Sequence, residues 1–503
     1  MRSRFVSWLS KIENSLEPSP PLHHRPLYKF MNTVVRFCFV LTSCFLLTSC
    51  KNTTPPGSQT SLRIGAAETD ITPPIGYRMA GYFDERLSTG THDPLKAKAI
   101  VFQQGKTKMA LVFCDLLGVS LNVTTNARAL ASRQTGIPFS NIMISATHSH
   151  TGPLFDDVRR DYFHQAAIAK NGSDSTEKVF YPDFLTERIV QSISEAYSKL
   201  RPAELETGIT KQENMTFNRR FWMKNGKVVF NPGQLNTNIV RPAGPTDSDV
   251  GVLLARDAAS HHPFAGVTVF AMHSDTVGGT EHSADYEYYL QETLRRSFGP
   301  DFISAFGAGT CGDLNHIDVS KKQTLKGFAM AENLGTTLGQ TVLGATNQLV
   351  AVTQPSLAVR GATLQLPLQE VSPEQVAAAR SKADKLGDPN TDFLTKVGMA
   401  KTLDLARHGL VYPMEVQVFR FDSNTALVCL PGEIFVELGM AIKQASPFKN
   451  TMVMSICNDR PNYVPTRKAF TEGSYEVTNS RVKPGSGESL VDAALKLLHE
   501  VKQ

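Results

Sequence analysis

The chain has 503 residues, of which 41% are hydrophobic and 20% charged, the composition of a globular protein that can bury a large core. Its formal net charge is +5, but residues 1–50 hold six Lys/Arg and two Asp/Glu, so the remaining chain has a charge of +1. A nearly neutral body gives no electrostatic case for nucleic-acid binding, and we expect no nucleic-acid partner.

Residues 31–52, MNTVVRFCFVLTSCFLLTSCKN, have the layout of an export signal, so we assign residues 1–50 to it, with Met31 as a candidate true start. The apolar stretch is too short for a membrane-spanning helix. LTSC at 47–50 resembles a bacterial lipoprotein signal with Cys50 as the lipidated membrane anchor. A secretion signal without lipid is the alternative. Both interpretations place the body outside the cytoplasm, and the first places it on a periplasmic or outer-membrane surface.

Residues 51–61, rich in Pro, Ser, Thr and Gly, predict a flexible tether, and residues 62–503 contain no further linker and no repeat. Strands follow one another with hairpin-like spacing as well as across helices, which predicts one large α/β (α+β) domain with mixed or antiparallel sheets flanked by helices. A TIM barrel would need eight regular strand–helix units, which the chain does not show. We expect strands at 62–72, 96–104, 108–120, 141–149, in a block over about 203–275 and at 414–433, and helices at 122–136, 181–200, 283–299, 328–345, 372–388, 393–409 and 488–501.

Four cysteines of the body have separations that match no zinc-ribbon spacing, and we expect them to be buried thiols rather than disulfide partners. They are Cys114, Cys311, Cys429 and Cys457.

Histidines stand where predicted strands end. SATHSHTGP at 145–153 places His148 and His150 two residues apart, and an extended strand would direct both imidazoles to one face. His273 ends a second apolar run, GVTVFAMH, and Glu433 ends a third, TALVCLPGE. Two His and one carboxylate leave an open coordination position for water, as catalytic zinc requires. A structural role for the His-x-His pair is the alternative, and spacing alone does not show that the three groups converge.

Seven short motifs support a resemblance to a known family. In chain order they are GAAETDITPP, GTHDPLKAKAIV, SATHSHTGP, FNRR, FAMHSD, LPGE and NYVPTRKAF with GSYE. Together they resemble the catalytic N-terminal domain of the neutral/alkaline (non-lysosomal) ceramidase family over roughly 62–503, as a divergent, lipoprotein-like bacterial member. The resemblance implies an amidohydrolase that uses Zn²⁺ and cuts a small-molecule or lipid N-acyl amide into a fatty acid and an amine.

The resemblance also assigns roles to residues of this chain. It implies that His150 moves a proton to the leaving amine, and that Arg219 and Tyr475 donate hydrogen bonds to substrate oxygen. The zinc ligands that it implies are His148, His273, Glu433 and Tyr463.

Two stretches depart from the family pattern. The chain reads CGDLNHI where ceramidases carry GDVSPN, so Asn315 stands at the position of a required Ser and offers an amide instead of a hydroxyl; we keep it among the catalytic candidates. SDTVGGTEHSADYEYY replaces the usual loop after His273, and we expect His282 in that loop to be solvated, with Asp285 either solvated or in contact with substrate. Two alternatives follow: a zinc hydrolase of a smaller polar amide or ester, and a surface lipoprotein that binds a ligand without chemistry.

Overall fold

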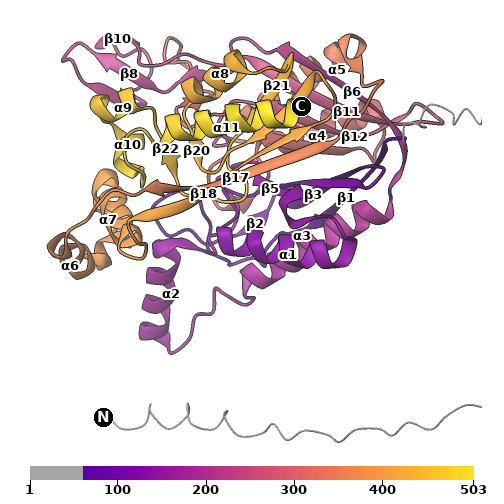
Figure 1. Cartoon of the computed structure of the whole chain (residues 1–503). Helices are drawn as coiled ribbons and strands as arrows, with labels where there is room; N and C mark the ends of the chain where they lie inside the picture. The colour runs from indigo at the N-terminus through magenta and orange to yellow at the C-terminus, as the bar shows by residue number, and fades with distance from the viewer. Residues whose placement is uncertain (1–60) are drawn as a thin grey trace, which may run out of the picture. The chain divides into compact units, whose positions relative to one another are not determined.

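The computed structural model describes residues 61–503, so the predicted export signal, Cys50 and nearly all of the predicted tether lie outside the described residues. Within residues 61–503, a nine-stranded sheet has the order β14-β12-β11-β6-β1-β3-β4-β5, and β16 pairs with β6 (Figure 1). Its strands are β1 (Arg63–Asp70), β3 (Lys96–Gln104), β4 (Thr107–Cys114), β5 (Ile142–Ala146), β6 (Arg201–Lys211), β11 (Asp249–Asp257), β12 (Pro263–Phe270), β14 (Ile303–Ala308) and β16 (Val350–Ala351).

The nine-stranded sheet folds back on itself between β1 and β6, which pair only through Arg63↔Pro202 and Ile64↔Arg201. One half of the sheet contains β1, β3, β4 and β5, and the other contains β6, β11, β12, β14 and β16. Because of the fold-back, β14 at one end of the strand order lies against β5 at the other. The segments that follow β5 and β12 can therefore meet, although the strand order separates them.

A second sheet packs across both halves of the first. Its strands, in order, are β17 (Ala358–Pro367), β18 (Val411–Arg420), β19 (Thr425–Cys429) and β21 (Asn450–Met454). The three layers share a core that includes Phe102, Leu253 and Leu427, one from each. Gly307 of β14 has no side chain where a Cβ would lie 2.6 Å from the sulfur of Met454, so β14 and β21 approach closely.

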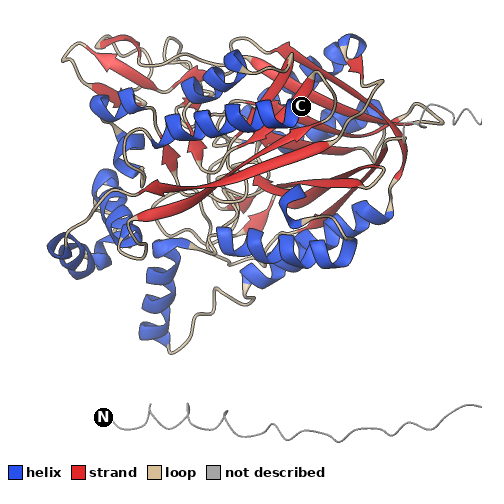
Figure 2. Cartoon of the chain, viewed as in Figure 1, coloured by secondary structure: helices blue, strands red, loops and turns tan. Residues whose placement is uncertain are grey.

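Helices cover the outer faces of these layers (Figure 2). α1 and α3 pack on the first half of the large sheet, α4 and α5 on the second half, and α8 and α11 on the four-stranded sheet. The helices are α1 (Leu121–Thr135), α2 (Asp157–Asn171), α3 (Tyr181–Ser198), α4 (Tyr286–Phe298), α5 (Phe328–Ala345), α6 (Pro373–Ser381), α7 (Phe393–Leu405), α8 (Val436–Ala445), α9 (Arg467–Glu472), α10 (Tyr475–Asn479) and α11 (Ser486–Lys502), with 3₁₀ turns η1 (Phe139–Asn141), η2 (Thr346–Gln348) and η3 (Ala383–Leu386).

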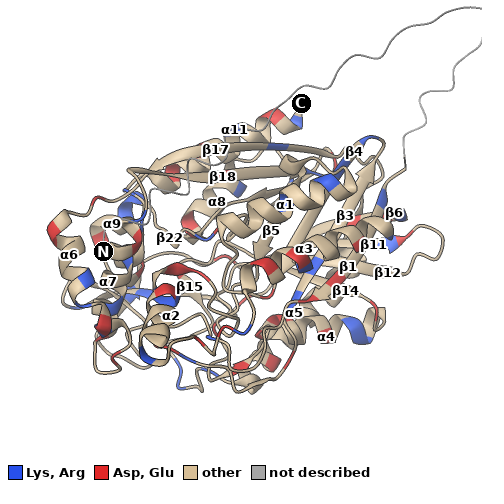
Figure 3. Ribbon diagram, turned by 90° about the horizontal axis from the view of Figure 1, so that it is seen from below, with Lys and Arg blue, Asp and Glu red and all other residues tan. Residues whose placement is uncertain are grey.

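Short strand pairs shape the loops at one edge of the sheets. They are β2 (Gly90–Thr91) with β13 (Glu281–His282), β7 (Phe217–Asn218) with β15 (Leu314–Asn315), β20 (Glu433–Ile434) with β22 (Tyr463–Val464), and the set β8 (Arg220–Met223), β9 (Val228–Phe230) and β10 (Ile239–Pro242). In residues 61–503 no helix combines the length and apolar character needed to cross a bilayer. Basic and acidic positions are interspersed over the elements seen in Figure 3.

The predicted fold class is confirmed. Five predicted helices, at 122–136, 181–200, 283–299, 328–345 and 488–501, appear with ends within three residues of the expected ones. The predicted strand at 108–120 ends early, at Cys114, and α2, α8, α9 and α10 were not predicted. The largely antiparallel pairing of the long sheet excludes the TIM barrel. The four cysteines of the described residues are buried and free, as expected.

Two glycines of α5 allow the effect of helix packing on stability to be distinguished from the effect of backbone entropy. A Cβ on Gly335 would lie 2.2 Å from the carbonyl oxygen of Tyr286 in α4, whereas a Cβ on Gly344 meets nothing within 4 Å. We expect Gly335→Ala to lower the free energy of unfolding by about 1–3 kcal/mol, because α4 must move. Gly344→Ala should raise it by about 0.5–1 kcal/mol, because Ala loses less entropy than Gly in a helix. Urea unfolding measures both changes, and equal effects would contradict the packing of α4 on α5.

Candidate metal centre and active-site cavity

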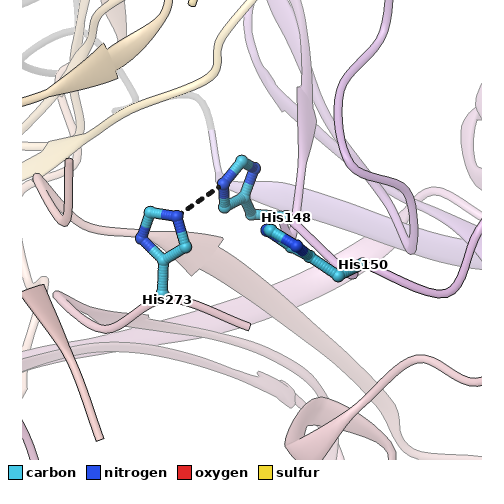
Figure 4. Close-up of side chains that lie close together, drawn as sticks. All are labelled: His148, His150 and His273. Carbon is cyan, nitrogen blue, oxygen red and sulfur yellow. Dashed lines mark hydrogen bonds between the residues drawn. The ribbon is translucent and has the colours of Figure 1, made fainter. Parts of the chain in front are cut away.

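Three side chains from separate parts of the fold converge on one point. The Nε2 atoms of His148 and His273 lie 3.0 Å apart, and Glu433 Oε2 lies 3.4 Å from the first and 3.6 Å from the second. Ligands around a tetrahedral metal with bonds of about 2.0–2.1 Å are separated by about 3.3 Å, close to all three distances. Figure 4 shows the two imidazoles turned toward each other.

The hydrogen bonds of the two imidazoles leave lone pairs at this point. His148 Nδ1 bonds to the carbonyl oxygen of Leu117 at 2.8 Å, and His273 Nδ1 bonds to that of Cys311 at 2.9 Å. A carbonyl only accepts, so each Nδ1 carries the hydrogen and a neutral ring presents its lone pair at Nε2. Burial lowers the pKa of His273 well below its ordinary value, which keeps that ring neutral.

The carboxylate of Glu433 adds a third electron-pair donor to those of the two imidazoles. Burial acts to raise the pKa of Glu433, but a proton on His148 and the guanidinium groups of Arg460 and Arg219 outweigh burial and lower the pKa to about 2. A metal ion in place of that proton would lower the pKa in the same direction. Glu433 Oε2 is buried and has no hydrogen-bond partner among the described residues. Imidazole lone pairs and an ionised oxygen that converge without a donor between them fit a metal ion. The buried histidine group can therefore bind a metal.

The segment Cys311-Gly312-Asp313 fixes this arrangement from behind. Its first carbonyl holds His273, and the carbonyl of Gly312 accepts a hydrogen bond from Arg219 Nη2 at 2.8 Å. A Cβ on Gly312 would lie 2.5 Å from the carbonyl oxygen of Glu433, so only glycine permits this approach. Asp313 Oδ1 accepts the backbone N–H of Val436 at 2.8 Å, which fixes the start of α8 just beyond Glu433.

Tyr463 and Arg219 stand beside the carboxylate. Tyr463 is the partner of Glu433 in the parallel pair β20–β22, so the two side chains point to the same face. Burial raises the pKa of Tyr463 well above its ordinary value, and Arg219 Nη2 donates to its hydroxyl oxygen at 3.0 Å. Arg219 is buried, and its Nε donates to Glu476 at 3.0 Å. The ring of Tyr475 lies 5.4 Å from that of Tyr463.

His150 is brought to the same site by a turn and not by an extended strand. β5 ends at Ala146 and His148 has a φ of 77°, so the expectation of two imidazoles on one face of an extended strand is wrong. A turn replaces the strand because the hydroxyls of Ser149 and Thr151 both donate to the carbonyl oxygen of Ser283. The ring planes of His148 and His150 are nearly perpendicular, at 88°. One ring nitrogen from each of His148, His150 and His273 nevertheless lies within 4.8 Å of the other two.

The imidazole of His150 is free of protein partners. Neither ring nitrogen has a hydrogen bond within residues 61–503, and the nearest carboxylate is Asp275, 3.7 Å from Nδ1. Burial lowers the pKa of His150 to about 3. Asp275 is itself held by the Tyr82 hydroxyl and by Lys326 Nζ, each at 2.5 Å. A free imidazole beside a fixed carboxylate can accept and release a proton.

Asp275, Tyr82 and Lys326 were missed by the sequence analysis. Asp275 lies two residues after His273 in the loop that departs from the family pattern, and that position was the available signal.

Asn315 makes its contacts within the protein. Its Oδ1 accepts the backbone N–H of Ile317 at 3.0 Å, and its Nδ2 donates to Asn231 Oδ1 at 3.0 Å. Asn231 has a φ of 42°, so the amide of Asn315 stabilises a strained turn at the cavity wall.

The site opens on a cavity of about 430 Å³ with a largely apolar wall. His150, Arg219, His273, Asn315, Tyr463 and Tyr475 line it together with the apolar side chains of Phe83, Phe230, Ile317, Val319, Leu325 and Phe393. The structure thus brings every predicted catalytic residue to this cavity, with His148 and Glu433 directly behind it.

Two residues of the divergent loop have structural contacts. His282 is buried, and its Nδ1 bonds to the carbonyl oxygen of Thr151 at 2.9 Å, so the expectation that it is solvated is wrong. It is buried because β13, which carries it, pairs with β2. Asp285 is also buried; its Oδ2 accepts the backbone N–H groups of Thr276 and Val277, each at 2.9 Å, and it shapes the loop rather than the cavity.

A second group of potential ligands, His164, Asp174 and Glu177, is an ion-pair network. Arg78 Nη1 donates to Asp174 at 2.5 Å, and Arg160 pairs with Glu177. Guanidinium groups already neutralise these carboxylates, so the group needs no metal ion for its stability.

Comparison with known proteins places the chain in a family. A family model described as neutral/alkaline non-lysosomal ceramidase, N-terminal, matches residues 62–316. Neutral ceramidase of Pseudomonas aeruginosa is 24% identical over 477 residues, which cover 82% of this chain and 68% of that protein. Neutral ceramidase A of Dictyostelium discoideum is 25% identical over 280 residues, which cover 51% of this chain and 36% of that protein. The match thus spans about a third of the Dictyostelium protein.

A solved structure has the same fold. The crystal structure of neutral ceramidase from Pseudomonas aeruginosa matches with a TM-score of 0.65 over 88% of this chain and 75% of that chain, at 20% identity.

Removal of a proposed ligand tests the metal centre. We expect His148→Ala and Glu433→Gln each to weaken metal affinity by at least about 100-fold, because each removes a donor. His164→Ala, in the ion-pair network, should leave the metal content unchanged. Mass-spectrometric metal analysis of the purified proteins decides, and equal metal content in all three variants would refute the assignment.

Proposed function

Because this chain belongs to the neutral/alkaline non-lysosomal ceramidase family, we propose that it is an exported zinc-dependent hydrolase that cuts an N-acyl amide, a ceramide or a related lipid, into a fatty acid and an amine. The observation that carries the proposal is the convergence of His148 Nε2, His273 Nε2 and Glu433 Oε2 beside an apolar cavity. Apolar walls with a few convergent polar groups are typical of sites for lipid-like ligands.

The donor set suits zinc. His148, His273 and Glu433 would hold the ion, and Tyr463, paired with Glu433, would add a phenol oxygen. A bound cation opposes the burial that raises the pKa of Tyr463. When bound, Zn²⁺ lowers the pKa of a water ligand and polarises a carbonyl.

The other residues of the cavity supply orientation and proton transfer. Arg219 and Tyr475 can donate hydrogen bonds to a substrate carbonyl, where negative charge develops as the amide is attacked. His150 can carry a proton to the leaving amine, and Asp275, 3.7 Å away, stabilises the ring while it is charged. Phe230 and Phe393 line the cavity and offer an apolar surface to an acyl chain.

Asn315 favours a second candidate, hydrolysis of a smaller polar amide or ester. It provides no free hydroxyl, and its amide is engaged with Asn231 and Ile317. A substrate panel of ceramide, short N-acyl amides and esters separates the two candidates by kcat/KM. A metal-loaded protein that hydrolyses no member of the panel would instead favour the non-catalytic ligand-binding lipoprotein.

His150→Ala separates proton transfer from metal binding. We expect kcat on the best substrate of the panel to fall about 10²–10⁴-fold, because a general acid is lost. The metal content should stay at the wild-type level, in contrast to His148→Ala. His164→Ala is the control for both readouts. Wild-type turnover by His150→Ala would contradict the role, and loss of the metal would make His150 a ligand.

The location outside the cytoplasm and the lipid anchor are proposals that rest on the sequence of residues 31–52. We expect Cys50→Ser to abolish metabolic labelling with a fatty-acid analogue and to move the protein from the membrane fraction to the soluble fraction. Cys44→Ser changes the other LTSC segment and should leave both unchanged. Continued labelling of Cys50→Ser would refute the anchor.

A further inference from the structure

A buried carboxyl group next to the loop of His273 has no part in the chemistry proposed above. Glu287 lies in the first turn of α4, is 1% exposed, and does not line the active-site cavity. Its Oε1 is hydrogen-bonded to the hydroxyl of Ser274, the residue that follows His273. Its Oε2 has no hydrogen-bond partner within residues 61–503. A buried carboxyl group with so few polar neighbours requires a physical explanation.

Ser274 joins the two loops that carry the histidines. Its hydroxyl donates to the carbonyl oxygen of Thr147 at 2.8 Å, and Thr147 precedes His148. Its own carbonyl oxygen accepts the backbone N–H of His150 at 3.2 Å. The segment that carries His273 is therefore bonded at two points to the segment that carries His148 and His150. These bonds fix the two segments beside the place where the Nε2 atoms of His148 and His273 meet.

The hydrogen atoms at Ser274 can be counted. A hydroxyl has one hydrogen, and a carbonyl oxygen can only accept. The carbonyl oxygen of Thr147 has no other donor within residues 61–503, so the hydroxyl hydrogen of Ser274 belongs to that contact. The contact between Ser274 and Glu287 then needs a second hydrogen, which the carboxyl group has to supply. A protonated Glu287 thus donates to Ser274, and Ser274 donates to Thr147.

The charges around Glu287 also favour the protonated form. The acidic groups that act on it are Asp285 and Asp115, the second of which is paired with Lys98 at 3.2 Å. Glu287 itself forms no ion pair within residues 61–503, so its ionised form would be a buried charge without a partner. Burial raises the pKa of Glu287 well above its ordinary value, and Asp285 acts in the same direction. Burial likewise raises the pKa of the adjacent Tyr286, which is neutral.

The N-terminus of α4 does not compensate a charge on Glu287. A helix N-terminus favours a carboxylate, but the N-cap residue Asp285 already occupies this position. The carboxylate of Asp285 accepts the backbone N–H groups of Tyr286 at 2.8 Å and of Thr276 and Val277, each at 2.9 Å. Of the two neighbouring acids, the one that accepts these hydrogen bonds keeps the charge, and the proton stays on Glu287.

From these contacts we propose that Glu287 is a positioning residue that carries its proton at neutral pH and donates a hydrogen bond to Ser274, so that the loops of the two metal-binding histidines are held together. It fixes the spacing of His148 and His273 and does not touch substrate. The inference rests on the proposed function only for the metal that these histidines would hold. An ionised Glu287 would compete with Thr147 for the single hydrogen of Ser274, and the bond between the loops would be lost.

The pH dependence of stability tests whether Glu287 holds a proton. Above the ordinary pKa of a glutamate, the unfolded chain loses that proton and the folded chain keeps it, so wild-type stability falls as the pH rises. Glu287→Gln has no such proton to lose. We expect its folding equilibrium constant, divided by that of the wild type, to rise about tenfold per pH unit between about pH 5.5 and 7.5. Urea unfolding of the metal-loaded full chain measures this ratio, and a ratio that does not change with pH would overturn the proposal.

Gln291→Leu is the matched control. Gln291 lies one turn further along α4, is 5% exposed, and its Oε1 has no hydrogen-bond partner within residues 61–503. The substitution changes no titratable group, so the corresponding ratio should be the same at every pH. An equal rise for Gln291→Leu would contradict the proposal, because the rise would then come from a change in α4 and not from a proton on Glu287.

Metal affinity tests the positioning role. We expect Glu287→Leu and Ser274→Ala each to weaken Zn²⁺ binding about 10- to 100-fold, because the bond between the two loops loses its support. Glu287→Gln should bind within about twofold of wild type, since an amide N–H can donate to Ser274 as the carboxyl group does. Gln291→Leu should also bind as the wild type does. Competition with a chromophoric chelator measures the dissociation constants. Unchanged affinity in Ser274→Ala, or an equal loss in Glu287→Gln and Glu287→Leu, would refute the role.

The possible failures are distinct. If Glu287→Leu does not fold, Ser274→Ala and Glu287→Gln still decide the positioning role. If the wild type binds no metal, the proposed function fails, and the pH dependence of Glu287→Gln still decides whether Glu287 carries its proton.

Discussion

The structure depends on one electrostatic constraint: two imidazole lone pairs and an ionised carboxylate oxygen lie within 3.6 Å of one another in the interior. Such groups repel each other unless a shared proton or a metal ion lies between them, and this buried group could bind a metal. The rest of the site serves this geometry. Carbonyl oxygens of Leu117 and Cys311 fix the ring tautomers, and the fold-back of the large sheet brings together segments that the strand order separates.

Local sequence was sufficient for the parts of the site that depend on local rules. Apolar runs ending in His148, His273 and Glu433 predicted polar groups at strand ends, and the mixed spacing of strands and helices predicted the fold class. Their convergence was not predictable from spacing, because it depends on where the sheet bends. That bend lies between β1 and β6, more than 100 residues apart in the chain, and it leaves no local pattern. The family motifs predicted which residues share one site. The pattern of neighbouring residues along the chain did not predict it.

The errors have a common physical origin in loops that follow strands. The strand predicted at 141–149 was extended three residues beyond the end of β5 at Ala146, although Ser149 and Thr151 turn the chain by donating to the carbonyl oxygen of Ser283 in a distant loop. The same tertiary contacts bury His282, which a polar loop sequence had suggested was solvated. Hydrogen-bond partners more than 100 residues away determine the conformation of such segments. The sequence of adjacent residues therefore does not predict that conformation.

Asn315 departs from the family pattern because it offers an amide instead of a hydroxyl, and that amide makes hydrogen bonds within the protein. Its amide holds Asn231 in the cavity wall through Nδ2 and the backbone of Ile317 through Oδ1. A serine hydroxyl is shorter than the amide and would have to make both contacts, as donor to Asn231 and as acceptor from Ile317, through a single oxygen. Asn315 is therefore part of the cavity wall and is held to the turn at Asn231. Phe393, the first residue of α7, lines the same cavity. The wall and the buried group that could bind a metal are thus held by separate contacts, the wall through Asn315 and the buried group through the carbonyl oxygens of Leu117 and Cys311.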